Sequence, residues 1–299
     1  MNAGRPRGET AVRRASEPLT VTGSSARASD PRRTHTRLRV VAPAVLGLAI
    51  LAAWHLATTT GAVPPTFLPA PSAVARRLVL ELTHGGLLRA TGITLGEAVL
   101  GCLLAAAVAL PTGWLVARSR VVAAALQPYL AASQAIPAVA IAPLLVLWVG
   151  YGIEPVVLLC ALLVFFPIVL STVLGLRTLD TDVIEAARLD GAHAWRMIRD
   201  IELPLAAPAL LTGLRNGFTL SITGAVVGEL VMGGRGLGLV LGVYSSSADT
   251  TGLFATLAVL CALAVLIFSA LLGLERVVDP MRPLSRRRAN QILARTARH

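Results

Sequence analysis

The chain has 299 residues, of which 55% are hydrophobic and 14% are charged, and its mean hydropathy is +0.71. This composition excludes an average soluble domain and indicates a membrane protein. The formal net charge of +11 raises the alternative of a nucleic-acid-binding protein. The basic residues, however, are concentrated in the two tails and in short stretches between apolar segments, which argues against a nucleic-acid partner.

The basic residues also exclude one kind of catalytic site. All 27 of them are arginines, and the sequence contains no lysine. A phosphate-binding loop of the form G-x-x-x-x-G-K-[ST] needs its lysine on the nucleotide phosphates. The chain therefore cannot carry a standard ATPase site, and in any ATP-driven machine the ATPase must be another polypeptide. No cofactor or metal is expected, because the histidines are scattered and the cysteines lie inside apolar segments without disulfide or metal spacing: Cys102, Cys160 and Cys261.

The N-terminal part of the chain changes character near residue 37. Residues 1–36 are rich in Arg, Ser, Thr and Pro, which predicts a disordered cytoplasmic tail. The apolar run from Val40 to Ala57 is longer than the core of a signal peptide and predicts the first membrane helix. After a proline-rich stretch, Ser72 to His84 has the pattern of an amphipathic helix that lies along the membrane surface.

The second predicted span, Thr91 to Ala117, contains several glycines, which indicate close packing inside a helix bundle. Glu97 is an ionisable residue within this span and therefore a candidate functional group. It lies about two turns from the predicted helix start, so it can also reach the membrane interface and serve only a structural role.

The third predicted span, about Ala123 to Val149, contains three prolines and is expected to be broken near Pro137. A break at membrane depth survives where the freed backbone faces protein or a water-filled cavity. Ser133, Gln134 and Pro137 are therefore candidates for the substrate pathway. The alternative is that the two polar side chains only satisfy backbone groups that the proline leaves free.

Three further spans are predicted, at about Glu154 to Leu176, Leu205 to Val227 and Leu253 to Leu274, with a Gly- and Ser-rich loop, Gly228 to Thr251, between the last two. Arg215 lies about 15 Å along the fifth span, near the middle of the bilayer, where a charge needs a partner or water. It either attracts an anionic substrate or forms a structural pair within the bundle, and the sequence favours the structural pair.

The distribution of arginine predicts the orientation of the chain. With six spans and both termini in the cytoplasm, 22 of the 27 arginines lie on the cytoplasmic side, 4 lie outside and Arg215 lies within a span. The positive-inside rule supports this orientation. It also places the loop from residue 180 to residue 204 in the cytoplasm.

This loop is a polar island between two apolar spans. Asp180 or Asp182 can cap a short helix that Gly191 then ends, and a second short turn places Trp195 and Ile198 on one side. Two short helices bent at a glycine, apolar on one side and charged on the other, are suited to the groove of a partner protein.

The loop sequence resembles the cytoplasmic loop of binding-protein-dependent ABC importer permeases, and pieces of the third and fourth spans are similar to the nitrate, sulfonate and taurine branch of that family. The matching spacing is E-A-A, three residues, G, nine residues and I-x-L-P. The alternative is an ordinary interfacial helix-turn-helix. The resemblance rests on Glu185, Ala186, Ala187, Gly191, Ile201, Leu203 and Pro204.

The resemblance implies an all-α membrane protein of the type I ABC importer permease kind, in the plasma membrane, with a permease domain over residues 37–275 and an Arg-rich cytoplasmic tail over 276–299. It implies cytoplasmic ATPase subunits, a second permease copy and an extracytoplasmic solute-binding protein, with a sulfonate, taurine or nitrate as the solute. It also favours a structural role for Arg215, which falls in a common G-L-R. The residues expected to couple to the ATPase are Glu185, Ala186, Ala187, Arg188, Gly191, Trp195, Ile198, Ile201, Leu203 and Pro204.

Two other classes of protein make different predictions. An ion-coupled secondary transporter would use Glu97, Arg215 and Glu229 and would contain inverted repeats, and no clear repeat is present. An intramembrane hydrolase would need an activated Ser or Asp at membrane depth, and the sequence offers no persuasive one. Enzyme activity within this chain is therefore not expected.

Overall fold

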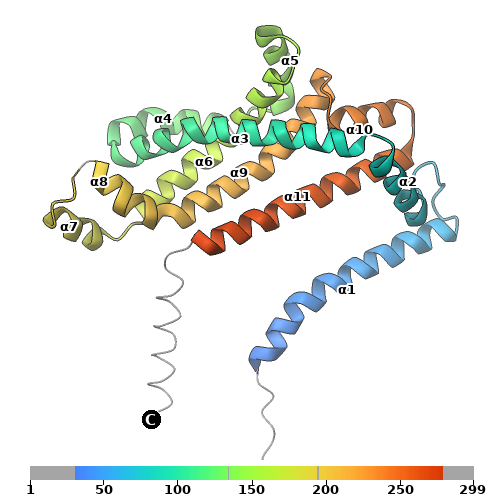
Figure 1. Ribbon diagram of the computed structural model, residues 1–299, viewed down its shortest axis with the longest axis horizontal. Helices are drawn as coiled ribbons and strands as arrows, with labels where there is room; N and C mark the ends of the chain where they lie inside the picture. The colour runs from blue at the N-terminus through green and yellow to red at the C-terminus, as the bar shows by residue number, and fades with distance from the viewer. Residues whose placement is uncertain (1–30, 134, 194, 279–299) are drawn as a thin grey trace, which may run out of the picture. The chain divides into compact units, whose positions relative to one another are not determined.

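The computed structural model describes residues 31–133, 135–193 and 195–278, and every regular element within them is a helix (Figure 1). The two predicted tails fall largely outside these residues, and Gln134 lies outside them as well. The chain divides into two units, residues 1–52 and 53–299. The elements are α1 (Pro31–Thr59), α2 (Pro71–Thr83), α3 (Leu87–Arg118), α4 (Arg120–Ser133), α5 (Ala138–Val149), α6 (Glu154–Arg177), α7 (Thr181–Leu189), α8 (Trp195–Met197), η1 (Ile198–Glu202), α9 (Leu203–Met232), α10 (Leu237–Ser246) and α11 (Thr250–Val278).

The first unit contributes most of α1. This helix begins at Pro31, earlier than the predicted start at Val40, so the last residues of the predicted tail are helical. Proline is well placed in the first turn of a helix, where its missing N–H needs no partner. The prediction of a helix over the apolar run is confirmed.

In the second unit, α3, α6 and α9 pack against one another and enclose the core. Glycines bring the helix backbones close together. A Cβ atom added at Gly113 of α3 would lie 2.6 Å from Cβ of Thr172 on α6, and one added at Gly217 of α9 would lie 2.8 Å from Cγ1 of Val164. The buried side chains of the core include Leu87, Ala98, Leu159, Val164, Ile168 and Ala225.

The predicted break in the third span is confirmed. Helix α4 ends at Ser133 and α5 begins at Ala138, with Pro137 in an extended conformation between them (φ −69°, ψ 123°). The Ser133 hydroxyl donates a hydrogen bond to the carbonyl of Leu130 over 2.9 Å. This local contact satisfies a carbonyl at the helix end, as the structural alternative for Ser133 expects.

Three helices of the described chain, α3, α6 and α11, are long and apolar enough to cross a membrane. A fourth span results if the helix from Trp195 to Met232 and α10, which are bent by 49° at a short break, count as one. The apolar parts of α1 (Val45–Thr59) and α5 (Val139–Val149) are shorter. The described residues therefore contain three or four of the six predicted spans, and the remaining spans stay a prediction.

The predicted loop from Gly228 to Thr251 is wrong in part. Helix α9 continues to Met232, and residues 237–246 form α10. The glycines and serines of this stretch favour a loop, whereas Leu237, Leu239 and Val240 give it enough apolar surface to pack as a helix on α9 and α11.

The helix predicted after the proline-rich stretch is present as α2 and is fixed to the end of the bundle, while its position along the membrane surface stays a prediction. The Arg77 guanidinium pairs with Asp249 (3.1 Å) and with Glu81 (3.0 Å). The Tyr244 hydroxyl donates a hydrogen bond of 2.6 Å to Glu81. These contacts join α2 to α10 and to the segment before α11.

Candidate functional site

The loop from residue 180 to residue 204, called the coupling loop below, joins α6 to α9 at one end of the bundle (Figure 1). Its first part is α7. The Asp180 carboxylate accepts a hydrogen bond of 3.0 Å from the Asp182 amide and caps the helix, so Asp180 is the cap of the two candidates. Gly191 has φ of +80°, in the left-handed region, and ends the helix as predicted.

The second part of the coupling loop differs from the prediction. After the single turn of α8, the wide-turn helix η1 (Ile198–Glu202) continues without a gap into α9. Pro204 was expected to stand where the loop ends and the next span starts, and it lies in the first turn of α9. A proline at that position loses no helical hydrogen bond, because the first N–H groups of a helix have no partner within it.

The apolar side chains of the coupling loop are divided between two surroundings. Helix α7 buries none of its residues, and Leu189 and Trp195 are 89% and 68% exposed. Met197 is buried in the bundle, while Ile198 and Ile201 are half-buried. Trp195 and Ile198 were predicted on one side and line the same cavity, but the tryptophan is the more exposed of the two.

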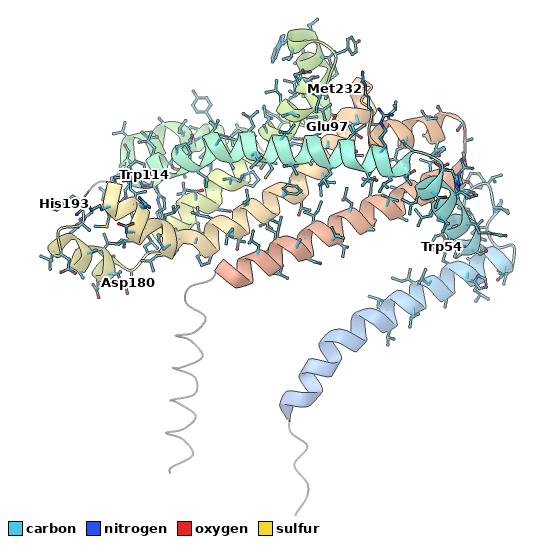
Figure 2. The ribbon with its side chains drawn as sticks, in the orientation of Figure 1. Trp54, Glu97, Trp114, Asp180, His193 and Met232 are labelled. Atoms are coloured by element: carbon cyan, nitrogen blue, oxygen red, sulfur yellow. The ribbon has the colours of Figure 1, made fainter. Side chains whose placement is uncertain are left out.

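Glu202 fixes the base of the coupling loop and is not among the predicted coupling residues. Its carboxylate is 1% exposed, accepts a hydrogen bond of 3.2 Å from the Trp114 indole N–H and forms an ion pair with Arg118. Both partners lie on the last turns of α3, and Figure 2 shows Trp114 at the same end of the bundle as His193. An acidic residue directly before a membrane span was the available signal.

Two cavities lie beside this anchor. One has a volume of about 480 Å³ and is lined by Trp114, His193, Trp195 and Ile198 among others. The second has a volume of about 270 Å³, and the predicted coupling residue Glu185 lies in its wall. Three charged side chains line both cavities: Arg118, Arg188 and Glu202.

Arg215 has its partners within the bundle. Its guanidinium lies 2.7 Å from the Glu275 carboxylate of α11 and 5.0 Å from the centre of the Phe268 ring. The Thr212 hydroxyl donates a hydrogen bond of 3.0 Å to the same carboxylate. The arrangement is the structural pair that the sequence analysis favoured over an anion site.

Within the described residues no group of three or more His, Cys, Asp or Glu side chains could hold a metal ion. These features together define a multi-pass helical membrane protein with an exposed helical loop at one end. The chain belongs to the family described as binding-protein-dependent transport system inner membrane component, which matches residues 109–282. It is thus an inner-membrane permease subunit of an ABC importer, and the ATPase is a separate subunit.

Several known permeases and one solved transporter structure are similar to this chain. The riboflavin transport system permease protein of Chloroflexus aurantiacus is 40% identical over 231 residues, which cover 77% of this chain and 86% of the relative. The taurine transport system permease protein of Escherichia coli is 29% identical over 236 residues, with coverage of 77% and 86%. The inward-facing MetNI methionine ABC transporter shares the fold, with a TM-score of 0.60 at 22% identity over 66% of this chain and 98% of that one.

The predicted family is confirmed, and the ion-coupled transporter and the hydrolase are ruled out. The predicted nitrate, sulfonate and taurine branch is not singled out, because the riboflavin permease is more similar to this chain than the taurine permease is. An ABC transporter complex with ATPase subunits follows from the family.

Proposed function

We propose that the coupling loop is the contact through which the ATPase drives this permease. The observation that carries the proposal is the exposure of Leu189 and Trp195 at the end of the bundle. Large apolar side chains exposed together on a loop favour a protein partner. The charged side chains of Glu185 and Arg188 lie beside them and provide polar contacts.

Movement would pass from the ATPase to the membrane helices through Glu202. When ATP binding draws two ATPase subunits together, α7 moves with the groove that holds it. Gly191 permits a change of angle between α7 and α8, because glycine adopts left-handed backbone conformations at little cost. The ion pair of Glu202 with Arg118 then carries the displacement to α3.

The complete importer then contains two copies of this chain, two ATPase subunits and an extracytoplasmic solute-binding protein. Six spans with both termini in the cytoplasm fit this assembly, because they leave the coupling loop on the ATPase side.

Two classes of solute are candidates. The resemblance of the third and fourth spans to the nitrate, sulfonate and taurine branch favours a small oxyanion. The 40% identity to a riboflavin permease favours an uncharged solute rich in hydrogen-bond donors. Both candidates agree with a permease that receives its solute from a binding protein.

The experiment is extraction of the tagged chain from its own host in mild detergent, followed by mass spectrometry of the proteins that remain bound. We expect an ATPase with a G-x-x-x-x-G-K-[ST] loop. The pair of variants Leu189→Ser and Trp195→Ser should lose it, while Leu147→Ser, an equally exposed residue of α5, should keep it. Retention of the ATPase by the loop variants would contradict the proposal.

A further inference from the structure

The smaller of the two cavities beside Glu202 lies between the ends of two membrane spans and the coupling loop. It has a volume of about 270 Å³, and its wall contains the last residues of α3 and α6 together with residues of α7. Figure 1 shows α7 at the same end of the bundle as the end of α6. The apolar part of the wall consists of Ala117, Leu176, Leu179 and Ile184.

Three of the five charged residues in this wall are arginines. Arg118 ends α3, Arg177 ends α6 and Arg188 lies in the last turn of α7. The two acidic residues are Glu185 and Glu202, so the wall has one positive charge in excess. Glu202 is 1% exposed and already paired with Arg118, and it therefore presents little negative charge to a ligand.

Two of these arginines have donors to spare. Among residues 31–133, 135–193 and 195–278, neither Arg177 nor Arg188 forms an ion pair. The Nη2 atom of Arg177 donates to the carbonyl of Val116 over 3.5 Å, which is long for a hydrogen bond. Each guanidinium carries five N–H donors. Within the described chain most of these donors are therefore left for an anion in the cavity.

The length of α6 places the cavity at the edge of the bilayer. This helix has 24 residues and carries a charged residue at each end, Glu154 and Arg177. At 1.5 Å per residue it is about 36 Å long, whereas the hydrocarbon core is about 30 Å thick. Arg177 therefore reaches the level of the lipid headgroups. Basic pockets between membrane helices on the cytoplasmic side bind the headgroups of anionic lipids.

We propose that this cavity binds the phosphate of an anionic phospholipid, with Arg177 as the main contact and Arg118 and Arg188 beside it. The site rests on the proposed function for the orientation of the chain, which puts this end in the cytoplasmic leaflet. A guanidinium suits a phosphate because its parallel N–H groups contact two oxygens at once. Leu176 and Ile184 give apolar surface to the glycerol and to the start of the acyl chains, which continue into the bilayer.

The surroundings favour a lipid over an acidic segment of the ATPase. Leu189 and Trp195, on which the ATPase contact was proposed, are absent from the described wall of this cavity. Much of the wall comes instead from the ends of two membrane spans. A bound phosphate would join Arg188 of the coupling loop to Arg177 of the bundle, so anionic lipid would stabilise the position of α7 against the spans.

Native mass spectrometry of the full-length chain, stripped of lipid in detergent, tests the site. The probes are phosphatidylglycerol, which is anionic, phosphatidylcholine, which has a phosphate but no net charge, and inorganic phosphate. We expect one phosphatidylglycerol to bind more tightly than phosphatidylcholine and to resist millimolar inorganic phosphate. Arg177→Gln should weaken this binding about tenfold, because it removes a charge-assisted hydrogen bond. Arg120→Gln is the matched control, since Arg120 is exposed at the same end but outside the described wall of the cavity, and it should bind like the wild type.

Equal binding of the two lipids, or an equal loss in the two variants, would overturn the site, because either result describes a general attraction of lipid to a basic surface. Displacement of phosphatidylglycerol by inorganic phosphate would overturn the lipid as ligand and assign the cavity to a free anion.

A second measurement covers the case in which Arg177→Gln fails to fold. Phosphatidylglycerol with a photoreactive group beside its phosphate should label residues 176–188 of the wild-type chain, and labelling confined to other segments would overturn the site. The same labelling in the complex with the ATPase should persist, and its loss on assembly would give the cavity to the ATPase. Failure to recover any ATPase would contradict the proposed function, whereas the lipid titration of the chain alone would still decide the site.

Discussion

Arg118 and Glu202 are joined in an ion pair whose two ends differ in their access to water: the Arg118 side chain is 37% exposed and that of Glu202 is 1% exposed. The pair connects the end of α3 to the start of α9, at the base of the coupling loop. The asymmetry means that the two residues are not equivalent targets for mutation.

Arg118→Ala is expected to destabilise the protein more than Glu202→Gln. Without Arg118 the buried carboxylate keeps only the Trp114 indole as a donor, which costs roughly 1–3 kcal/mol, whereas an Arg118 without Glu202 can be hydrated. Thermal unfolding of the purified protein measures the difference. The double variant should recover part of the loss of Arg118→Ala, and equal effects of the two single changes would contradict the asymmetry.

Gly191 provides a test of the movement of the coupling loop. A Cβ atom at Gly191 would meet nothing within 4 Å, so a substitution acts through the backbone alone. Gly191→Val should disfavour the left-handed φ of +80° by about 1–2 kcal/mol and lower the uptake per ATP hydrolysed. Gly191→Asn is the matched control, because asparagine tolerates this conformation, and it should keep most of the coupling. Full coupling in the valine variant would reject the hinge.

Arg215 and Glu275 form a pair whose side chains are only 16% and 22% exposed. Arg215→Met and Glu275→Met should each lower the unfolding temperature, because each leaves a poorly hydrated charge without its partner. The double variant should be more stable than either single variant and should retain uptake. Loss of uptake in a stable double variant would instead give Arg215 a role toward the solute.

Helix α3 contains two glycines at which a change to alanine should affect stability in different ways. Gly113 faces α6 in close contact, whereas Gly92 does not. Gly113→Ala forces its Cβ against Thr172 and should destabilise the protein by about 1–3 kcal/mol. Gly92→Ala meets nothing within 4 Å and should be neutral or stabilising by up to about 1 kcal/mol, because alanine favours helix more than glycine does. Unfolding in denaturant compares the two, and equal effects would reject close packing at Gly113.

Local rules were sufficient for much of the fold. The cap at Asp180, the end of α7 at Gly191 and the break at Pro137 each depend on the backbone preferences of one or two residues, so the sequence predicted them. The course of residues 237–246 was missed because a helix rich in glycine has little propensity and is held by distant groups, here Thr94 and Glu229.

The sequence predicted the coupling loop but not the distant residues that hold it in place. The sequence motif predicted the coupling loop and its exposed helix. Glu202 could not be predicted from the motif, because its partners Trp114 and Arg118 lie far from it in the chain. Glu97 was noted as an ionisable residue within a span. Glu229 was noted in the same way, but its hydrogen bonds with Thr94 and the Gly238 amide depend on the packing of α3, α9 and α10, which periodicity does not show.

The glycine contacts of α3, α6 and α9 have a mechanical consequence. Helices whose backbones touch cannot slide past one another without opening voids, so the three are expected to turn together as a stiff rod. A displacement of the helices at Glu202 would therefore also displace the opposite end of the three-helix unit, where Glu97 lies. A single rotation of the three helices would then couple ATP binding at the coupling loop to a movement at the opposite end of the bundle.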